Sequence, residues 1–171
     1  MEAGSLVRRL RSDEWQAFRQ LRLESLRTDP LAFGSTVERE AAYPDERWRE
    51  WARRGSMEPR EATFVATDPN GALIGMVGFF SGEEGPTVWG MWVQPSRRGR
   101  GVGRSLFTTL LGWIDRILPE SKVVLEVNPD QASAVRIYSA NGFRFTGVER
   151  PLGHDSRATV KQMTRDRAFG Q

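Results

Sequence analysis

The chain contains no cysteine and only two lysines, Lys122 and Lys161. Without cysteine there is no disulfide, no thiolate metal site and no acyl-cysteine intermediate. No lysine follows a glycine-rich stretch, so the chain also lacks the motif Gly-x-x-x-x-Gly-Lys-Ser/Thr of P-loop proteins. These absences exclude disulfide-stabilised folds, thiol chemistry and P-loop phosphate binding.

Long apolar runs are missing too. No run approaches the ~20 residues of a membrane-spanning helix, and "MEAGSLVRRLRSDEW" has no apolar centre typical of a secretory signal. We therefore expect a cytoplasmic protein with no membrane partner. The net charge is only +3, and nearly all the positive charge is arginine, which favours local anion binding over a nucleic-acid interface. The only histidine is His154, and the acidic residues show no metal-ligand spacing, so we expect no metal.

The length of 171 residues predicts one domain over residues 1–171. "SLVRRL" is expected to be a strand, followed by a helix capped by Ser12 or Asp13 that ends near Thr28. A turn-rich break, "DPLAFGST", and a helix from about Pro44 to Arg54 come next. Then the hydrophobic period changes. The segments "ATFVATD", "GALIGMVGFFSG" and "TVWGMWVQP" predict three strands joined by the short turns "DPNG" and "GEEGP", which indicates an antiparallel meander.

The second half alternates between helices and strands. A helix is expected over Gly101–Leu118, a buried strand at "KVVLEV" and a helix at "QASAVRIYSA" stopped by Asn141-Gly142. Two final strands, "FRFTGVE" and "RATVKQM", flank the polar loop "PLGHDSR". The fold class predicted is α/β, with a mixed sheet flanked by helices.

The stretch "RRGRGVGRS" joins the strand ending near Val93 to the helix beginning near Gly101. The first N–H groups of a helix lack intrahelical partners and lie at the positive end of its dipole. Glycines let a phosphate approach these groups, and arginines add charge-assisted hydrogen bonds. The stretch is therefore expected to bind a pyrophosphate, unless it is only a tight turn with solvated arginines.

Two motifs carry a resemblance to a known family. Arg98-x-x-Gly101-x-Gly103 resembles the acetyl-CoA pyrophosphate loop of the GCN5-related N-acetyltransferase (GNAT) superfamily, and "NPDQASAVRIYSANGF" resembles its second signature. Their order and spacing agree with that superfamily over roughly Phe64–Met163. The resemblance implies a single-domain GNAT-like sheet, in which an antiparallel meander precedes two central parallel strands that splay apart to admit the cofactor.

The resemblance also implies roles for particular residues. Backbone groups of Met91, Trp92 and Val93 would lie along the pantetheine and acetyl group of acetyl-CoA, and one N–H would polarise the thioester carbonyl. For the side chains of Trp89 and Trp92 we expect core packing. Gln131 stands where an asparagine often contacts the cofactor. The residues of the pyrophosphate loop would be Arg98, Gly99, Arg100, Gly101, Val102, Gly103 and Arg104.

Two residues are candidates for proton transfer. Tyr138 stands where the family places its general acid near the CoA sulfur, although a tyrosine packed against the sheet is the structural alternative. Glu126, twelve residues earlier, is placed similarly to the glutamate base of ribosomal-protein alanine N-acetyltransferases. A glutamate ion-paired to an arginine is an equal alternative for Glu126. Glu83 and Glu84, in the turn before the fourth strand, are expected to be solvated.

The function predicted is acetyl-CoA-dependent transfer of an acetyl group directly to an amine. The acceptor stays open: a small amine, an amino acid, an antibiotic or a protein N-terminus. We expect the first helices and the loop "ERPLGHDSRAT" to form the wall of the acceptor site, and a homodimer is an expectation from the family. The alternatives are transfer of another acyl group, a CoA-binding sensor without catalysis, and an RNA-binding domain that uses the arginine loop.

Overall fold

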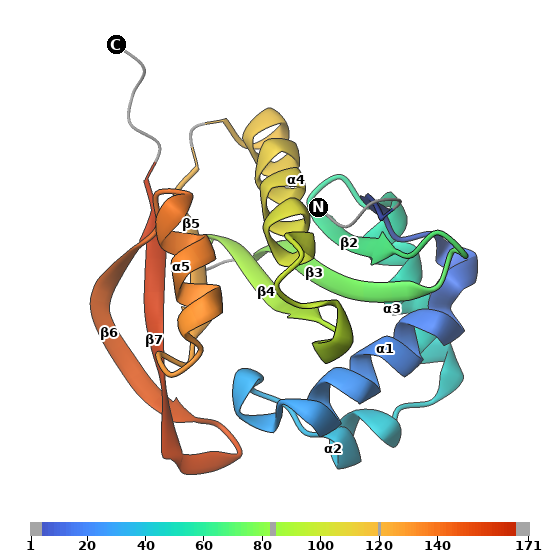
Figure 1. Ribbon diagram of the computed structural model, residues 1–171, viewed down its shortest axis with the longest axis horizontal. Coiled ribbons are helices and arrows are strands. Elements are labelled where there is room, and N and C mark those ends of the chain that lie inside the picture. The colour runs from blue at the N-terminus through green and yellow to red at the C-terminus, as the bar shows by residue number, and fades with distance from the viewer. Residues whose placement is uncertain (1–4, 83–84, 120, 167–171) are drawn as a thin grey trace.

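The computed structural model describes residues 5–82, 85–119 and 121–166. Its strands form one sheet in the order β1-β2-β3-β4-β5-β7-β6 (Figure 1). Neighbouring strands are antiparallel except β4 and β5, which run parallel. The expected mixed sheet is thus confirmed. The strands are β1 Leu6–Arg9, β2 Glu61–Thr67, β3 Leu73–Gly82, β4 Gly85–Val93, β5 Val123–Val127, β6 Arg144–Leu152 and β7 Asp155–Arg165.

Helices cover both faces of this sheet. One core packs α4 and α5 against β2–β5, and its centre includes Leu106, Phe107, Leu125 and Met163. A second core packs α1 and α3 against the other face of β2–β4, around Phe18, Trp48 and Trp92. The helices are α1 Trp15–Thr28, α2 Val37–Ala41, α3 Asp45–Met57, α4 Val102–Ile117 and α5 Ala132–Ala140, with short 3-10 turns η1 Ser12–Glu14, η2 Pro30–Ala32 and η3 Pro95–Arg97.

The turn chemistry read from the sequence is present in the structure. At "DPNG", the Asp68 carboxylate accepts hydrogen bonds from the N–H groups of Asn70 and Ala72, and Gly71 has a φ of +85°. Gly142, which ends α5, also has a φ of +85°. Both positions need a residue that tolerates the left-handed region, which glycine does without strain. Glu83 and Glu84 of the turn "GEEGP" lie outside the described residues.

The parallel pair β4–β5 diverges almost at once. Only Thr87 with Val124 and Val88 with Leu125 are in register, so the rest of β4 has no strand partner on its β5 side. On its other side β4 bulges against β3 next to Gly90, which has a φ of +67°. A bulge turns the strand locally. The expected splayed opening is therefore present, on the β5 side of the last residues of β4.

Two local predictions were wrong, and one short helix was not predicted. Neither Ser12 nor Asp13 caps α1; both lie in the 3-10 turn that precedes it, where the Glu14 carboxylate accepts from the Arg11 N–H at 3.0 Å. The turn-rich break "DPLAFGST" is present as predicted, and the short helix α2, capped by Thr36, follows it without having been predicted. The predicted loop "ERPLGHDSRAT" is instead a tight hairpin, because β6 continues to Leu152 and β7 begins at Asp155.

Candidate functional site

The glycine-arginine stretch forms the connection from β4 to α4. Gly99 and Gly101 have φ angles of +74° and +81°, and Gly101 is the residue immediately before the helix. The Ser105 N–H bonds to the Gly101 carbonyl at 3.0 Å, which starts the helical ladder. The preceding N–H groups, of Val102, Gly103 and Arg104, therefore have no carbonyl partner within the helix. This end of α4 has the chemistry of an anion site.

The arginines of this connection have different environments. Arg98 turns back toward the protein: its Nε donates to the Val93 carbonyl at 2.9 Å and its Nη2 donates to the Asp29 carboxylate at 2.5 Å. Arg100 and Arg104 are exposed. Binding of a pyrophosphate by Arg98 would therefore compete with two contacts inside the protein. Arg100 and Arg104 stay predictions as anion contacts.

The end of β4 supplies the backbone that the resemblance assigns to the cofactor. Val93 packs in the core with α4, and Met91 packs against that same core. The Trp92 side chain is only 5% exposed and packs with α1 and α3 on the other face, as expected, with its Nε1 donating to Asp29 at 2.6 Å. Trp89 packs against the same second core. The side chains of both tryptophans therefore serve packing.

Tyr138 lies on α5, buried between α4 and the strand that follows α5. Its ring centroid is 4.9 Å from that of Phe107 and 6.3 Å from that of Phe143. Burial raises the pKa of the Tyr138 phenol far above its ordinary value. Within the described residues its hydroxyl makes no hydrogen bond. The hydroxyl oxygen is not among the fully buried polar atoms that lack a partner, so it keeps some access to solvent although the ring is buried.

The second half of α5 approaches the start of α4. A Cβ added to Gly103 would lie 3.4 Å from Cδ1 of Ile137, the residue before Tyr138. Gln131 immediately precedes α5 and is partly exposed. The structure thus brings the glycine loop and the tyrosine helix together, on one side of the opening between β4 and β5. The roles of Gln131 and Tyr138 toward a cofactor stay predictions.

Glu126 faces the other way. Val123, Leu125 and Val127 of β5 are buried with α4 and α5, so the alternating side chain of Glu126 projects from the opposite face. Its two oxygens accept from Arg150 of β6, Oε1 from Nε at 2.7 Å and Oε2 from Nη2 at 2.5 Å. The ion pair considered from the sequence therefore exists. Proton transfer by Glu126 stays a prediction.

The first part of the turn-rich break, to which the sequence assigned no role, crosses the site. Residues 29–33, between α1 and α2, are attached to both sides of the opening. Asp29 bonds to Trp92 of β4. The Leu31 carbonyl accepts from Asn128 Nδ2, just after β5, at 3.3 Å. The Phe33 carbonyl accepts from His154 Nε2 at 2.7 Å, and a carbonyl can only accept, so this nitrogen carries the hydrogen.

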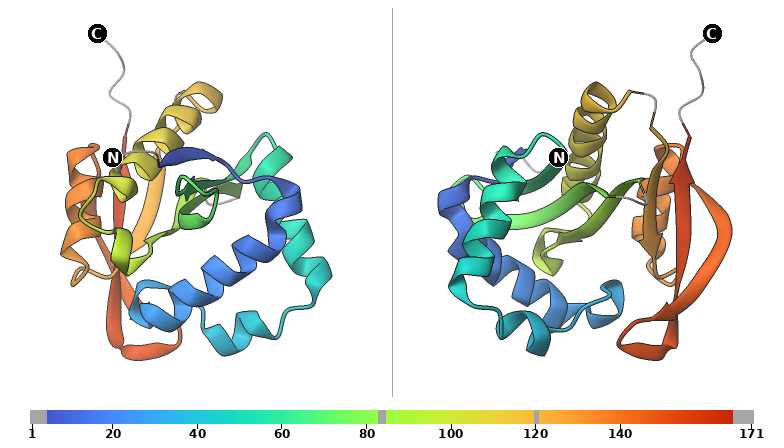
Figure 2. Two further views of the ribbon diagram at one scale, coloured as in Figure 1. Left: turned by 45° about the vertical axis from the view of Figure 1, so that its right-hand side comes forward. Right: turned by 180° about the vertical axis from the view of Figure 1, so that it is seen from behind.

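The 29–33 segment and the turn of the β6–β7 hairpin accordingly lie at the same end of the molecule (Figures 1 and 2). The His154 side chain is exposed, and its ring holds this contact. No local sequence signal reveals these attachments, since the partners are 63, 97 and 121 residues apart in the chain. The Asn128 side chain offered the one hint, because it also accepts from the Asp130 N–H as turn asparagines do.

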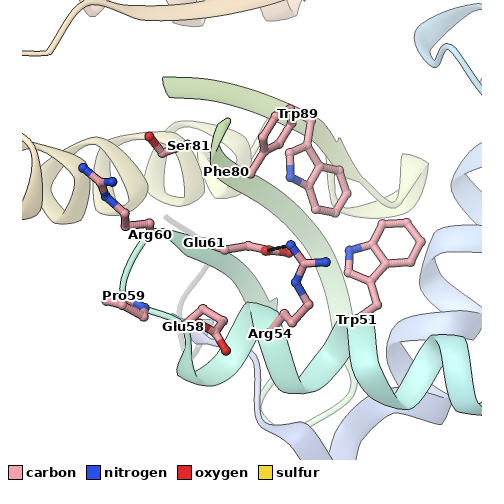
Figure 3. A pocket seen from close by; sticks show the side chains of 9 residues that line it. All are labelled: Trp51, Arg54, Glu58, Pro59, Arg60, Glu61, Phe80, Ser81 and Trp89. Carbon is pink, nitrogen blue, oxygen red and sulfur yellow. Dashed lines mark ion pairs between the residues drawn. The ribbon is translucent and has the colours of Figure 1, made fainter. Parts of the chain in front are cut away.

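A pocket of about 590 Å³ lies elsewhere, between the end of α3 and the strands β2–β4 (Figure 3). Trp51 and Trp89 lie beside the ion pair of Arg54 with Glu61, in which Nη2 and Oε2 are 2.5 Å apart. None of the residues predicted for catalysis or for cofactor binding lines this pocket. This pocket is therefore separate from the predicted acetyl-CoA site.

Within residues 5–82, 85–119 and 121–166, no three histidine, aspartate or glutamate side chains lie close enough together to hold a metal ion. Nor does any helix there have both the length and the apolar character to cross a bilayer.

Comparison with known proteins identifies the family. A family model described as "Acetyltransferase (GNAT) family" matches residues 11–143. The chain is 26% identical over 153 residues to "N-alpha-acetyltransferase RimI" of Mycobacterium tuberculosis, covering 81% of this chain and 94% of that one. It is 34% identical over 83 residues to "L-2,4-diaminobutyric acid acetyltransferase" of Nocardia farcinica, covering 46% of this chain and 42% of that one.

A solved structure shares the fold. The protein yncA from Salmonella typhimurium, determined with its cofactor acetyl-CoA, superposes with a TM-score of 0.76 at 16% identity, covering 98% of this chain and 96% of that one. The chain belongs to the acetyltransferase (GNAT) family. Acetyl-CoA is the acetyl donor of the enzymes of this family, so the resemblance found in the two sequence motifs is confirmed.

Proposed function

We propose that the protein transfers the acetyl group of acetyl-CoA directly to an amine. The observation that carries the proposal is the two-pair register between β4 and β5, which leaves the last residues of β4 without a strand on that side, next to the glycine N-terminus of α4. A strand-like pantetheine chain fits such an opening, and its pyrophosphate would reach the free N–H groups of Val102, Gly103 and Arg104. The Tyr138 hydroxyl makes no hydrogen bond within the described residues, so it is available to a ligand in this place.

When bound, acetyl-CoA supplies a thioester, whose carbonyl carbon accepts the amine and whose sulfur departs. The backbone of Met91–Val93 would hold the acyl group and polarise its carbonyl. Glu126 would accept a proton from the ammonium of the acceptor, directly or through water, and Tyr138 would give its proton to the leaving sulfur and regain one from solvent. One C–N bond forms and one C–S bond breaks, which leaves an acetylated amine and CoA.

The names of two similar enzymes indicate which acceptors to test first. One relative is named for an N-terminal α-amine and the other for a free amino acid. Small amines, amino acids, antibiotics and protein N-termini therefore all enter the first assay. Purified protein is mixed with acetyl-CoA and each amine, and free thiol is followed. Thiol release above the amine-free background supports the proposal. Tight CoA binding by calorimetry without release would instead favour a sensor, and release only with a longer acyl-CoA would change the donor.

The proton path has its own test. A lysine-type ammonium has a pKa near ~10.4, so most of the acceptor must lose a proton before it attacks. Glu126→Gln should lower turnover most at low pH and recover as the pH rises and free amine appears. Rates are measured from pH 6 to about 9.5, a range around the reference pKa values of thiols and α-amines. A variant with the parental pH profile would remove Glu126 from the mechanism and leave water as the base.

A further inference from the structure

The Glu126–Arg150 ion pair occupies the group that the proposed reaction needs. Both carboxylate oxygens accept from the guanidinium, at 2.7 and 2.5 Å. A carboxylate in this bidentate arrangement has its best acceptor positions taken. Each oxygen keeps a further lone pair, so release from Arg150 is what gives an ammonium access to the better-placed acceptor positions of Glu126.

The position of the pair makes it relevant to the acceptor. Glu126 directly follows Leu125, the last residue of β5 that is in register with β4. Its side chain projects from the face opposite α4 and α5. Two residues further along, Asn128 holds the 29–33 segment, and the hairpin that carries Arg150 holds the same segment through His154. The pair therefore stands at the mouth of the opening, on the face away from the glycine loop.

The pair is also easy to open. The side chains of Arg150 and Glu126 are 62% and 38% exposed. Ion pairs with this much access to water contribute little net stability, since solvent screens the charges and replaces the hydrogen bonds. A ligand can open the pair if it has an anionic group that binds Arg150 and a cationic group that binds Glu126. A molecule with both groups would replace the internal pair without leaving either charge unpartnered.

We propose that the acceptor is a small amino acid, whose own carboxylate binds Arg150 and thereby frees Glu126 for the ammonium that is acetylated. This inference rests on the proposed function. The fork of the guanidinium matches a carboxylate bidentately whether it belongs to Glu126 or to the substrate. The proton that Glu126 then takes from the ammonium passes to solvent after the C–N bond has formed. Arg150 thus acts as a specificity residue that couples recognition of the carboxylate to release of the base.

Acceptors with the same amine but without a carboxylate should bind differently from an amino acid. A diamine without a carboxylate has no group for Arg150, so the guanidinium stays on Glu126. A peptide N-terminus offers Arg150 only neutral amide carbonyls, which form weaker hydrogen bonds than a carboxylate does. Both classes should be poor acceptors in comparison with a free amino acid.

The experiment uses matched acceptors that differ only in the carboxylate. Lysine is compared with 1,5-diaminopentane and ornithine with 1,4-diaminobutane, together with a short C-terminally amidated peptide. kcat/KM is measured by thiol release with the parent and with Arg150→Gln. We expect the parent to prefer the amino acid of each pair about 10–100-fold, the range of one charged hydrogen-bonding contact. Arg150→Gln should lose most of that factor with amino acids and should match or exceed the parent with diamines, because Glu126 is then free.

Controls separate this role from a structural one. Arg157→Gln removes a guanidinium of the same hairpin that pairs with Asp155 at 3.0 Å, and it should leave the preference unchanged. Arg150→Lys keeps the charge without the fork and should retain part of the preference. Thermal unfolding and CoA affinity establish that each variant is folded.

The outcomes are distinct. Equal kcat/KM for both members of each pair in the parent, the best activity with the peptide, or an unchanged preference in Arg150→Gln would each overturn the amino-acid inference while acetyl transfer stands. No thiol release with any acceptor would overturn the proposed function, and the inference with it.

Discussion

The carboxylate of Asp29 accepts a 2.6 Å hydrogen bond from the indole N–H of Trp92. The same oxygen accepts from Arg98 at 2.5 Å, so one side chain at the end of α1 holds both the end of β4 and the loop that follows it. The guanidinium of Arg98 also lies 5.8 Å from the centroid of the Trp92 ring. The N-terminal helices are thus joined to the connection in which the cofactor loop is predicted.

Asp29→Asn should weaken this junction without breaking it. An asparagine oxygen still accepts from Trp92, but the charge-assisted contact with Arg98 is lost. We expect a decrease of about 1 kcal/mol in the free energy of unfolding, measured with urea. Glu24→Gln is the matched control, because Glu24 accepts from Gln94 at 3.1 Å on the same helix without contacting Arg98. An equal loss in both variants would show that Arg98 adds nothing at Asp29.

Tyr138→Phe should slow turnover while the fold and CoA affinity are retained. The hydroxyl has no hydrogen-bond partner among the described residues, so its removal leaves no orphaned group and should not lower the melting temperature. The expected loss in kcat is about 10²–10⁴-fold, the usual contribution of a positioned acid. A variant at parental speed would show that the thiolate departs without this proton.

The pH dependence of Tyr138 follows from its burial. Desolvation raises the pKa of the phenol, so the proton donor stays protonated throughout the assay range and causes no alkaline loss of kcat there. Its neutral form also contributes to stability at all pH values below the ordinary tyrosine pKa of about 10, and this contribution falls as the pH rises above that value. An alkaline decline of kcat that starts near pH 8 and disappears in Tyr138→Phe would contradict the raised pKa, while it would keep Tyr138 as the proton donor.

Gly101 and Gly103 should fail in different ways when replaced by alanine. Gly101 has a φ of +81°, where a Cβ costs about 1–2 kcal/mol, so Gly101→Ala should lower stability. At Gly103 an added Cβ meets Ile137 Cδ1 at 3.4 Å and Val93 Cγ2 at 3.6 Å, which are tolerable contacts. Gly103→Ala should therefore fold, and Gly103→Val should weaken acetyl-CoA binding further if a phosphate approaches the backbone there. Calorimetry with CoA and with pantetheine, which has no phosphate, separates a loss of phosphate contacts from a loss of stability. Equal affinity of the parent protein for both ligands would exclude a pyrophosphate-binding site.

Arg22 and Glu40 form the most buried ion pair among the described residues. Their side chains are 7% and 4% exposed and bond twice at 2.8 Å. Glu40→Gln would leave a buried guanidinium without its counter-charge, and we expect a loss of about 3–5 kcal/mol in the free energy of unfolding. Replacing both with apolar residues of similar volume should cost much less. If the double variant were as unstable as Glu40→Gln, packing and not charge would govern the site.

Much of the fold was predictable because its signals are local. The glycines at 71, 101 and 142 occupy positive-φ positions, and Asn-Gly ended α5 where the sequence indicated. The errors have non-local causes. Glu14 is drawn to Arg8 at 2.6 Å, which favours the 3-10 turn before α1. The helix α2 has only five residues and carries Glu40, whose partner Arg22 lies on another helix. A periodicity search does not find either of these contacts.

Part of the candidate site was also predictable from the sequence. The glycine loop, the splayed strands and the tyrosine helix follow from the family resemblance that the two motifs carry, and the structure places them beside one another. The partners of Arg98 and Glu126 do not follow from motifs, because Asp29 and Arg150 lie 69 and 24 residues away in sequence. Which charged side chains meet across a sheet depends on strand order and register, and the position of β7 between β5 and β6 could not be derived from the pattern of apolar residues.

That strand order has a consequence for synthesis of the chain. β1–β4 pair with one another in an unbroken series, so this part of the sheet needs no residue beyond Val93. β5 is in register with β4 at two positions only, but with β7 at five, from Val123 with Arg165 to Val127 with Lys161. β6 also has β7 as its neighbour. On a ribosome, which releases the N-terminal part first, the strand that carries Glu126 must wait for the last described strand before it gains most of its partners. A nascent chain that stops before β7 therefore has the meander and the glycine loop, but not the second wall of the opening.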